Sequence, residues 1–179
     1  MANLYDTAPA FDEPIAVIRH CHERIRKQLT TLDKLVSYLP DRGVDESVQA
    51  AAKAVLKYFN KAAPLHHQDE EVDLLPALRA TVQGEDAHLL EKATTTILQH
   101  HKEMDRLWQT LRAQLEALED GSGYDLSAAD VEDFSALYRE HMALEEGQIA
   151  PLAMRVLSEQ QMRELGASMQ ERRGIVPAT

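Results

Sequence analysis

Residues 66–76 read HHQDEEVDLLP and residues 141–151 read HMALEEGQIAP, so the pattern H-x3-E-E-x4-P occurs twice, 75 residues apart. In each copy the first His stands four residues before the first Glu. Side chains four residues apart lie on the same face of an α-helix and can bind one centre. The repeat therefore predicts two helices that each turn one imidazole and one carboxylate to the same side.

Apolar residues recur at alternating steps of three and four, the helical period, over residues 15–36, 48–77, 93–118 and 131–152. Pro14 favours a helix start, and Ser127 has the chemistry of an N-cap. No segment alternates with period two over a useful length, so strands are not expected. We predict an all-α fold, an up-down-up-down antiparallel four-helix bundle with a short extra C-terminal helix.

The loops between the four segments have the lengths expected for neighbours in such a bundle, and no change in composition marks a second domain. We expect the bundle over residues 12–155, and a C-terminal helix and tail, packed on the bundle or trailing from it, over residues 156–179. Pro64 and Pro76 lie inside the second segment. Because proline lacks an N–H and clashes with the preceding turn, a kink or short break is expected near each.

The composition favours a helical, water-soluble domain: of 179 residues, 44% are apolar and 27% are charged. The formal net charge of -11 would repel nucleic-acid phosphates and anionic membrane surfaces, so neither is an expected partner. There is no apolar run long enough for a transmembrane helix. The single cysteine and the acidic first residues, which lack a basic-then-apolar leader pattern, predict a cytoplasmic location.

One histidine replaces an apolar residue in each of the four segments. A lone histidine there is commonly a core residue with one hydrogen bond, but four at comparable heights on adjacent helices indicate a shared site. Buried carboxylates beside them are unfavourable unless they are paired or bind a metal. Two helix pairs that each offer one His and then one His plus one Glu predict a two-metal centre, and imidazole with carboxylate suits iron, manganese or zinc. Its expected ligands are His22, His66, Glu70, His101, His141 and Glu145.

Two predicted ligands in the first copy of the repeat have a neighbour of the same residue type, His67 and Glu71. These neighbours stand about 100° around the helix, so a solvent-facing or outer position is expected for both. Glu71 is suited to accept the second N–H of a coordinating histidine.

Other polar residues near the predicted ligands have simpler expected roles. His100 is expected to be exposed or in an outer position, and His20 and His88 to lie away from the centre. Cys21 is expected to be a packed or partly exposed free thiol. Tyr138 is most simply a core residue, with a hydrogen bond to a ligand on the metal as the open alternative.

Four stretches resemble the hemerythrin-like, HHE cation-binding domains: CHERI at 21–25, LHHQDEEVDLLPAL at 65–78, QHHKEMDRLW at 99–108 and REHMALEEGQIAPL at 139–152. The resemblance covers roughly residues 12–155, and the motifs occur in the family's order. It implies a non-haem centre of two iron ions inside a four-helix bundle, with glutamates bridging the ions. Carried over position by position, it implies the same six ligands, one His on the first and third helices and a His–Glu pair on the second and fourth.

The third helix departs from the pattern of the oxygen-carrying hemerythrins, which the chain otherwise resembles. Those proteins have H-x3-H there, whereas the positions four residues from His101 are Ile97 and Asp105. The fifth histidine is therefore expected to be missing, unless Asp105 takes its place. Four His and two Glu are similar to the set of the iron-sulfur-repair and nitric-oxide-linked branch, which places reversible O2 storage in question.

The expected function is the binding of iron and of a small ligand, O2, peroxide or NO, in stress response or iron handling. The alternatives are a sensor of O2 or iron that acts through a partner, and a store or donor of iron. The H-E-x-x-H motif of zinc hydrolases is absent, and Glu85 and His88 form the only E-x-x-H spacing, without the second pair that ferritin-like sites use.

Overall fold

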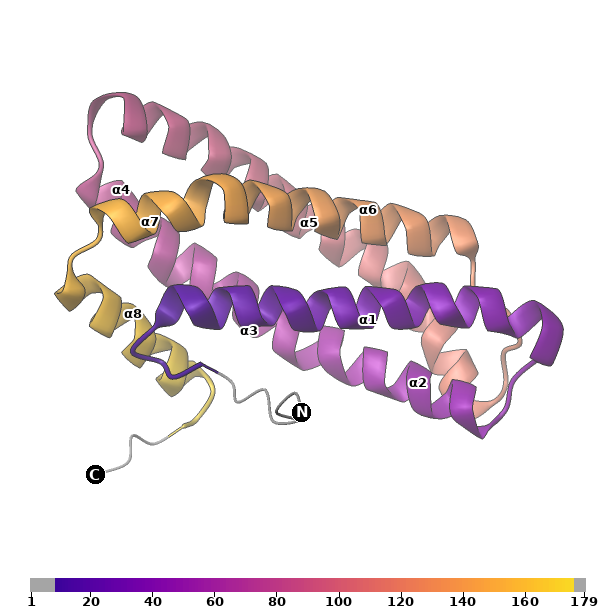
Figure 1. Cartoon of the computed structure of the whole chain (residues 1–179). Coiled ribbons are helices and arrows are strands. Elements are labelled where there is room, and N and C mark those ends of the chain that lie inside the picture. The colour runs from indigo at the N-terminus through magenta and orange to yellow at the C-terminus, as the bar shows by residue number, and fades with distance from the viewer. Residues whose placement is uncertain (1–8, 176–179) are drawn as a thin grey trace, which may run out of the picture.

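The computed structural model describes residues 9–175, and within this range every regular element is a helix and none is a strand. The all-α prediction is confirmed. Figure 1 shows four rows of helix that lie side by side and are joined by turns. The first row is α1 (Pro14–Arg42); the second is α2 (Glu46–Lys57), η1 (Tyr58–Ala62), α3 (Ala63–Gln68), η2 (Asp69–Leu74) and α4 (Leu75–Thr81); the third is α5 (Gly84–Asp120); the fourth is α6 (Ala128–Leu144), η3 (Glu145–Ile149) and α7 (Ala150–Val156). A further helix, α8 (Glu159–Arg172), follows the fourth row.

Short polar side chains and a glycine set the ends of these helices. Asp45 caps α2, because its Oδ1 accepts a hydrogen bond from the Val48 N–H at 3.0 Å. Ser127 caps α6 as predicted, and its Oγ accepts from the Asp130 N–H at 3.2 Å. Gly121 ends α5 with a φ of 76°, in the left-handed region that favours glycine.

The segments η1, η2 and η3 are π-helical, and each stands directly before an α-helix whose first or second residue is a proline: Pro64, Pro76 and Pro151. In η2 the Glu70 carbonyl accepts from the Leu75 N–H five residues later, and in η3 the Glu145 carbonyl accepts from the Ala150 N–H. A wider turn accommodates proline, which cannot donate a hydrogen bond and clashes with the carbonyl four residues before it. The kink or break expected near Pro64 and Pro76 is therefore a π turn within a continuous row. Each copy of the sequence repeat contains one π turn, η2 in the first copy and η3 in the second.

Two apolar clusters fill the interior, and a layer of polar side chains lies between them. On α1, Ile18 belongs to one cluster and Ile25 to the other, while His22 stands between them with only 1% of its surface exposed. α5 repeats this order with Ile97, His101 and Met104. The four rows thus hold the predicted site at one level of the molecule, sealed by apolar side chains above and below it.

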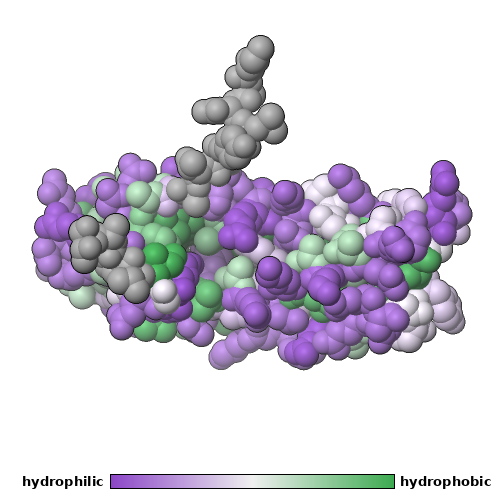
Figure 2. Space-filling model, turned by 90° about the horizontal axis from the view of Figure 1, so that it is seen from below, coloured by the Kyte–Doolittle hydropathy of each residue, from purple (hydrophilic) through white to green (hydrophobic). Residues whose placement is uncertain are grey.

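α8 is packed on one end of the molecule, where its Leu165 and Met169 are buried in the same apolar cluster as Ile15 and Leu78. Of the tail predicted over residues 156–179, residues 176–179 lie outside the described range. Figure 2 shows hydrophilic side chains over much of the face seen from below, with a hydrophobic area toward the left, the end where Figure 1 places α8.

Across residues 9–175, the helices are all too short or too polar to span a lipid bilayer.

Candidate metal centre

Seven buried His and Glu side chains converge between the two apolar clusters and form two sets. Within each set, every residue offers one potential ligand atom that lies within 4.8 Å of those of the other members. The His22 group consists of His22, His66, Glu70 and Glu145. The His67 group consists of His67, His101 and His141. All four rows contribute: α1 carries His22, the second row carries His66, His67 and Glu70, α5 carries His101, and the fourth row carries His141 and Glu145.

Glu70, a member of the His22 group, also contacts the His67 group and presents one oxygen to the histidines of each. Its Oε1 is 3.0 Å from His66 Nε2 in the His22 group. Its Oε2 is 3.1 Å from His101 Nε2 and 3.8 Å from His141 Nε2 in the His67 group. A carboxylate in this position can bind one ion through each oxygen.

Glu145 occupies a similar place from the fourth row. Its Oε2 is 2.9 Å from His22 Nε2 and 3.5 Å from His141 Nε2, so it also contacts a histidine of each group. Two carboxylates that contact histidines of both groups suit cation binding, because their negative charges would offset part of the charge that a metal ion brings into the interior.

Within the described part of the chain, nine buried side-chain atoms of this centre lack a hydrogen bond. They are both ring nitrogens of His66 and His141, Nε2 of His67 and His101, both oxygens of Glu70, and Oε1 of Glu145. Several lie 3.0–3.8 Å from one another without forming a hydrogen bond. Buried polar atoms are nearly always satisfied, so atoms that face one another without hydrogen bonds fit a site built to hold metal ions.

Two outer carboxylates orient the lone histidines of the first and third rows. His101 Nδ1 donates to Glu71 Oε1 at 2.5 Å, and His22 Nδ1 donates to Glu146 Oε1 at 2.8 Å. Arg26 in turn donates to both oxygens of Glu146 at 2.8 Å. With the proton on Nδ1, the Nε2 atom of each histidine is left to face the centre. The expectation that Glu71 accepts the second N–H of a predicted ligand is confirmed.

We expect Glu71→Gln to weaken metal binding by about 10–100-fold, the range for loss of an outer partner of a ligating histidine. The neutral amide would hold the His101 ring less firmly and would make its Nε2 less basic. Competition between the protein and a chelator for Co²⁺ measures the affinity. Glu140→Gln is the matched control, because the Glu140 carboxylate is exposed and 4.0 Å from His100. Equal affinities for the two variants would contradict the orienting role of Glu71.

Burial and mutual contacts shift the protonation of the metal-free centre. Burial by itself would lower the pKa of His101, but the negative charge of Glu70, 3.1 Å from its Nε2, and the hydrogen bond to Glu71 raise it to about 9. Burial, with the negative charge of Glu70 nearby, raises the pKa of Glu145 to about 7. Burial and neighbouring histidines hold the pKa of His67 and of His141 well below the usual value. At neutral pH the protein without metal therefore carries an additional proton at His101, and Glu145 is about half protonated; a bound metal would displace both.

Metal affinity should consequently rise with pH. A group that is protonated in the metal-free protein and deprotonated in the complex releases its proton on binding, so affinity increases with pH until the pKa of that group is passed. For His101 this holds below about pH 9, and Glu145 adds to the slope below about pH 7. We expect up to about tenfold per pH unit for each proton released, measured by chelator competition with Co²⁺ over this range. A flat profile would contradict the protonation assigned to His101.

His67 lies at the centre, which the sequence interpretation did not expect. It is 9% exposed, and its ring stacks on that of His101 with the centroids 4.0 Å apart. The ring of the preceding residue, His66, instead meets the ring of His22 on α1, at 5.0 Å. Because the second row lies between α1 and α5, a rotation of about 100° turns two successive side chains toward different neighbours, and both face inward. Of the two positions predicted for His67, the solvent-facing one is wrong, because the side chain is buried beside His101 and His141.

The structure thus places a fifth histidine, His67 of the second row, beside the predicted ligands His101 and His141. Asp105 does not take that place, because it is exposed. The sequence signal for His67 is the pair of consecutive histidines, His66 and His67. They lie on a row of helices that packs against two other rows.

The remaining candidates lie outside the two groups. His100 is buried rather than exposed, with its ring centroid 5.8 Å from that of His141, and His88 is exposed. Tyr138 is buried among aromatic rings, and its ring centroid is 6.1 Å from that of His67. Burial raises the pKa of the Cys21 thiol to about 11, which keeps it protonated and a poor metal ligand.

Residues 13–153 match the hemerythrin HHE cation-binding domain. The chain belongs to the hemerythrin HHE family. It is also 31% identical, over 165 residues, to an uncharacterized protein of Haemophilus influenzae, an alignment that covers 92% of each chain. The matched HHE region contains every member of the His22 and His67 groups, while α8 follows it. Cation binding, which the family's description states, agrees with the buried donor atoms of this centre.

Proposed function

We propose that this hemerythrin HHE protein holds two iron ions, one at the His22 group and one at the His67 group, and binds O2, peroxide or NO there. The observation that carries the proposal is the position of Glu70, whose two oxygens face histidines of different groups. The six ligands expected from the sequence and His67 would form the donor set. The proposal includes an up-down-up-down bundle over residues 12–155 with a tail over residues 156–179, in the cytoplasm, without nucleic-acid or membrane partners.

The two groups would hold their ions differently. Three histidines and the shared carboxylates surround the His67 group, whereas the His22 group has two histidines and the same carboxylates. When bound, iron supplies reversible electron exchange and coordination positions for a small ligand. The His22 group has fewer protein donors, so it is the side where we place the small ligand.

A cavity of about 10 Å³ lies beside the His22 group, lined by His22 and Glu145 among apolar side chains such as Ile18, Leu74 and Ile149. That volume corresponds to about one water-sized molecule. A space this small excludes larger substrates, which supports a very small ligand such as O2, peroxide or NO.

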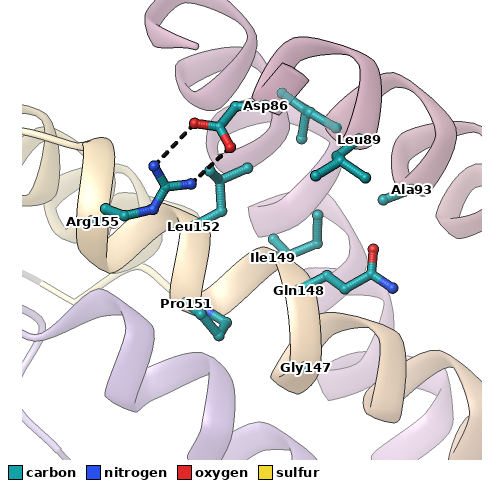
Figure 3. A pocket seen from close by; sticks show the side chains of 10 residues that line it. Asp86, Leu89, Ala93, Gly147, Gln148, Ile149, Pro151, Leu152 and Arg155 are labelled. Carbon is teal, nitrogen blue, oxygen red and sulfur yellow. Dashed lines mark hydrogen bonds and ion pairs between the residues drawn. The ribbon is translucent and has the colours of Figure 1, made fainter. Parts of the chain in front are cut away.

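A larger cavity of about 470 Å³ opens between α5 and the η3–α7 segment, and the Asp86–Arg155 ion pair stands at its edge (Figure 3). Ile149 lines both this cavity and the small one beside His22. It is 2% exposed and, among the described residues, is the one that lines both spaces, so the two spaces meet at its side chain. We propose that small ligands pass from the larger cavity to the centre when the Ile149 side chain moves.

Ile149 variants test this function. Ile149→Ala should speed the binding of NO to the reduced, iron-loaded protein by about tenfold, and Ile149→Phe should slow it, at a stability cost of about 1–3 kcal/mol for overpacking. Rapid-mixing absorption spectroscopy gives the rates, and iron content should stay at the wild-type level. Leu78→Phe is the control, since Leu78 is buried in the same cluster and lines neither cavity.

Wild-type and variant proteins that bind NO, O2 and peroxide at identical rates would contradict the proposed route. An iron-loaded protein whose absorption responds to none of the three would contradict ligand binding and favour an iron store or donor.

A further inference from the structure

Asp69 is a buried carboxylate of the metal-bearing segment that does not belong to either ligand group. It stands directly before Glu70, and its side chain is only 1% exposed. Arg172 and Arg173 donate to its two oxygens, the latter through Nη2 at 2.6 Å. Arg172 also donates through Nη2 to Asp73 Oδ2 at 2.5 Å. We refer to Asp69, Asp73, Arg172 and Arg173 as the Asp69 ion cluster.

The ion cluster joins the C-terminal end of α8 to the π turn η2. Both arginine side chains are largely covered, at 15% and 18% exposure. Removing one partner of a charge pair that is shielded from solvent is strongly unfavourable, because it leaves an uncompensated buried charge. The backbone of η2, which also carries Glu70, is therefore held from outside the bundle by two cations on another helix.

α8 is fixed on the bundle at further points, which makes it a firm support for the two arginines. At its start, Gln161 Nε2 donates to Thr81 Oγ1 at 2.8 Å. In its middle, Gly166 lies so close to the Phe11 carbonyl that an added Cβ would come within 1.8 Å of the oxygen. The helix thus crosses from the end of α4 to η2 with little freedom to shift.

We propose that Arg172 and Arg173 are positioning residues for the metal centre: through Asp69 they hold η2 in the geometry that keeps Glu70 between the two groups. The inference rests on the proposed metal function but concerns residues that lie outside the matched HHE region. α8 acts as a C-terminal support, and the centre retains its metals only while that helix is seated.

The test compares metal release from wild type, Arg172→Gln/Arg173→Gln, and Asp69→Asn, each loaded with Co²⁺ and then mixed with excess chelator. We expect the double arginine variant and Asp69→Asn to release Co²⁺ at least about tenfold faster and to shift its visible absorption bands, which report the ligand geometry. Because the arginines act through Asp69, combining all three substitutions should add little to either variant alone.

Three controls separate positioning from general destabilisation. Arg163→Gln removes an exposed cation of the same helix and should change nothing. Leu115→Ala weakens the distant apolar cluster and should lower thermal stability without moving the Co²⁺ bands. Gly166→Ala keeps every charge but should displace α8 from Phe11, and should reproduce the faster release.

Wild-type release rates and Co²⁺ bands in both the double arginine variant and Asp69→Asn would overturn the inference while leaving the metal centre intact. A wild-type protein that binds no Co²⁺ and no iron would instead overturn the proposed function. Faster release in these variants with unshifted bands and the same thermal loss as Leu115→Ala would also overturn positioning, because destabilisation alone would then account for the result.

Discussion

Glu70→Ala should abolish stoichiometric metal binding, and the affinity for Co²⁺ or iron should fall by more than about 100-fold. This exceeds the loss of affinity that follows removal of a hydrogen-bond partner of a ligating histidine. The substitution removes the carboxylate whose oxygens lie 3.0 Å from His66 and 3.1 Å from His101, and with it the one side chain that contacts both groups so closely. Metal analysis of the purified variant, after anaerobic loading with ferrous iron and desalting, measures the effect.

Glu103→Ala is the matched control for Glu70→Ala, because Glu103 is a partly exposed glutamate whose carboxylate pairs with Arg106 on the same helix. The control should bind metal as the wild type does. Circular dichroism should show that both variants remain helical, since the two apolar clusters are unchanged. Full metal content in folded Glu70→Ala would contradict the shared role of this carboxylate.

His67→Ala should weaken metal binding at the His67 group by more than about tenfold, because that group would keep only two of its three imidazoles, so that after desalting the variant retains closer to one ion per chain than the wild type's two. The remaining ion should belong to the His22 group, which His67 does not enter. Iron analysis after desalting gives the stoichiometry.

His88→Ala serves as the control for His67→Ala, since His88 is an exposed histidine near the start of α5, well before His101 on the same helix. Two ions per chain in the His67 variant, with unchanged affinity, would contradict membership of His67 in the donor set and would favour the outer position that helical geometry alone predicts.

The difference between sequence and structure at His67 has a clear physical origin. Periodicity describes one helix against one core, and it predicted that residues 100° from His66 would turn outward. The second row has helices on two sides, so its inward-facing arc is wider than a single stripe. Which neighbour lies on which side is a property of tertiary packing, and no local pattern in residues 48–77 specifies it.

Much of the remaining fold and site could be predicted from residue spacing and helix-forming rules. The spacing of four between His66 and Glu70 predicted a shared inward face, and the structure brings both into one group. The prolines indicated an irregular helix, but the choice of a π turn over a kink or break depends on packing that lets the row continue. The ion pairs of Asp69 with Arg172 and Arg173 join residues 103 and 104 positions apart, so no sequence window could connect them.

The count of iron ions per chain tests the central claim most directly. Protein loaded anaerobically with excess ferrous iron and then desalted should contain about two iron ions per chain, as expected for two groups that share two carboxylates. Retention of no iron, or of a single ion, would contradict a two-iron centre. Preferential retention of zinc or manganese from an equal mixture would contradict iron as the metal while leaving the seven-residue donor set in place.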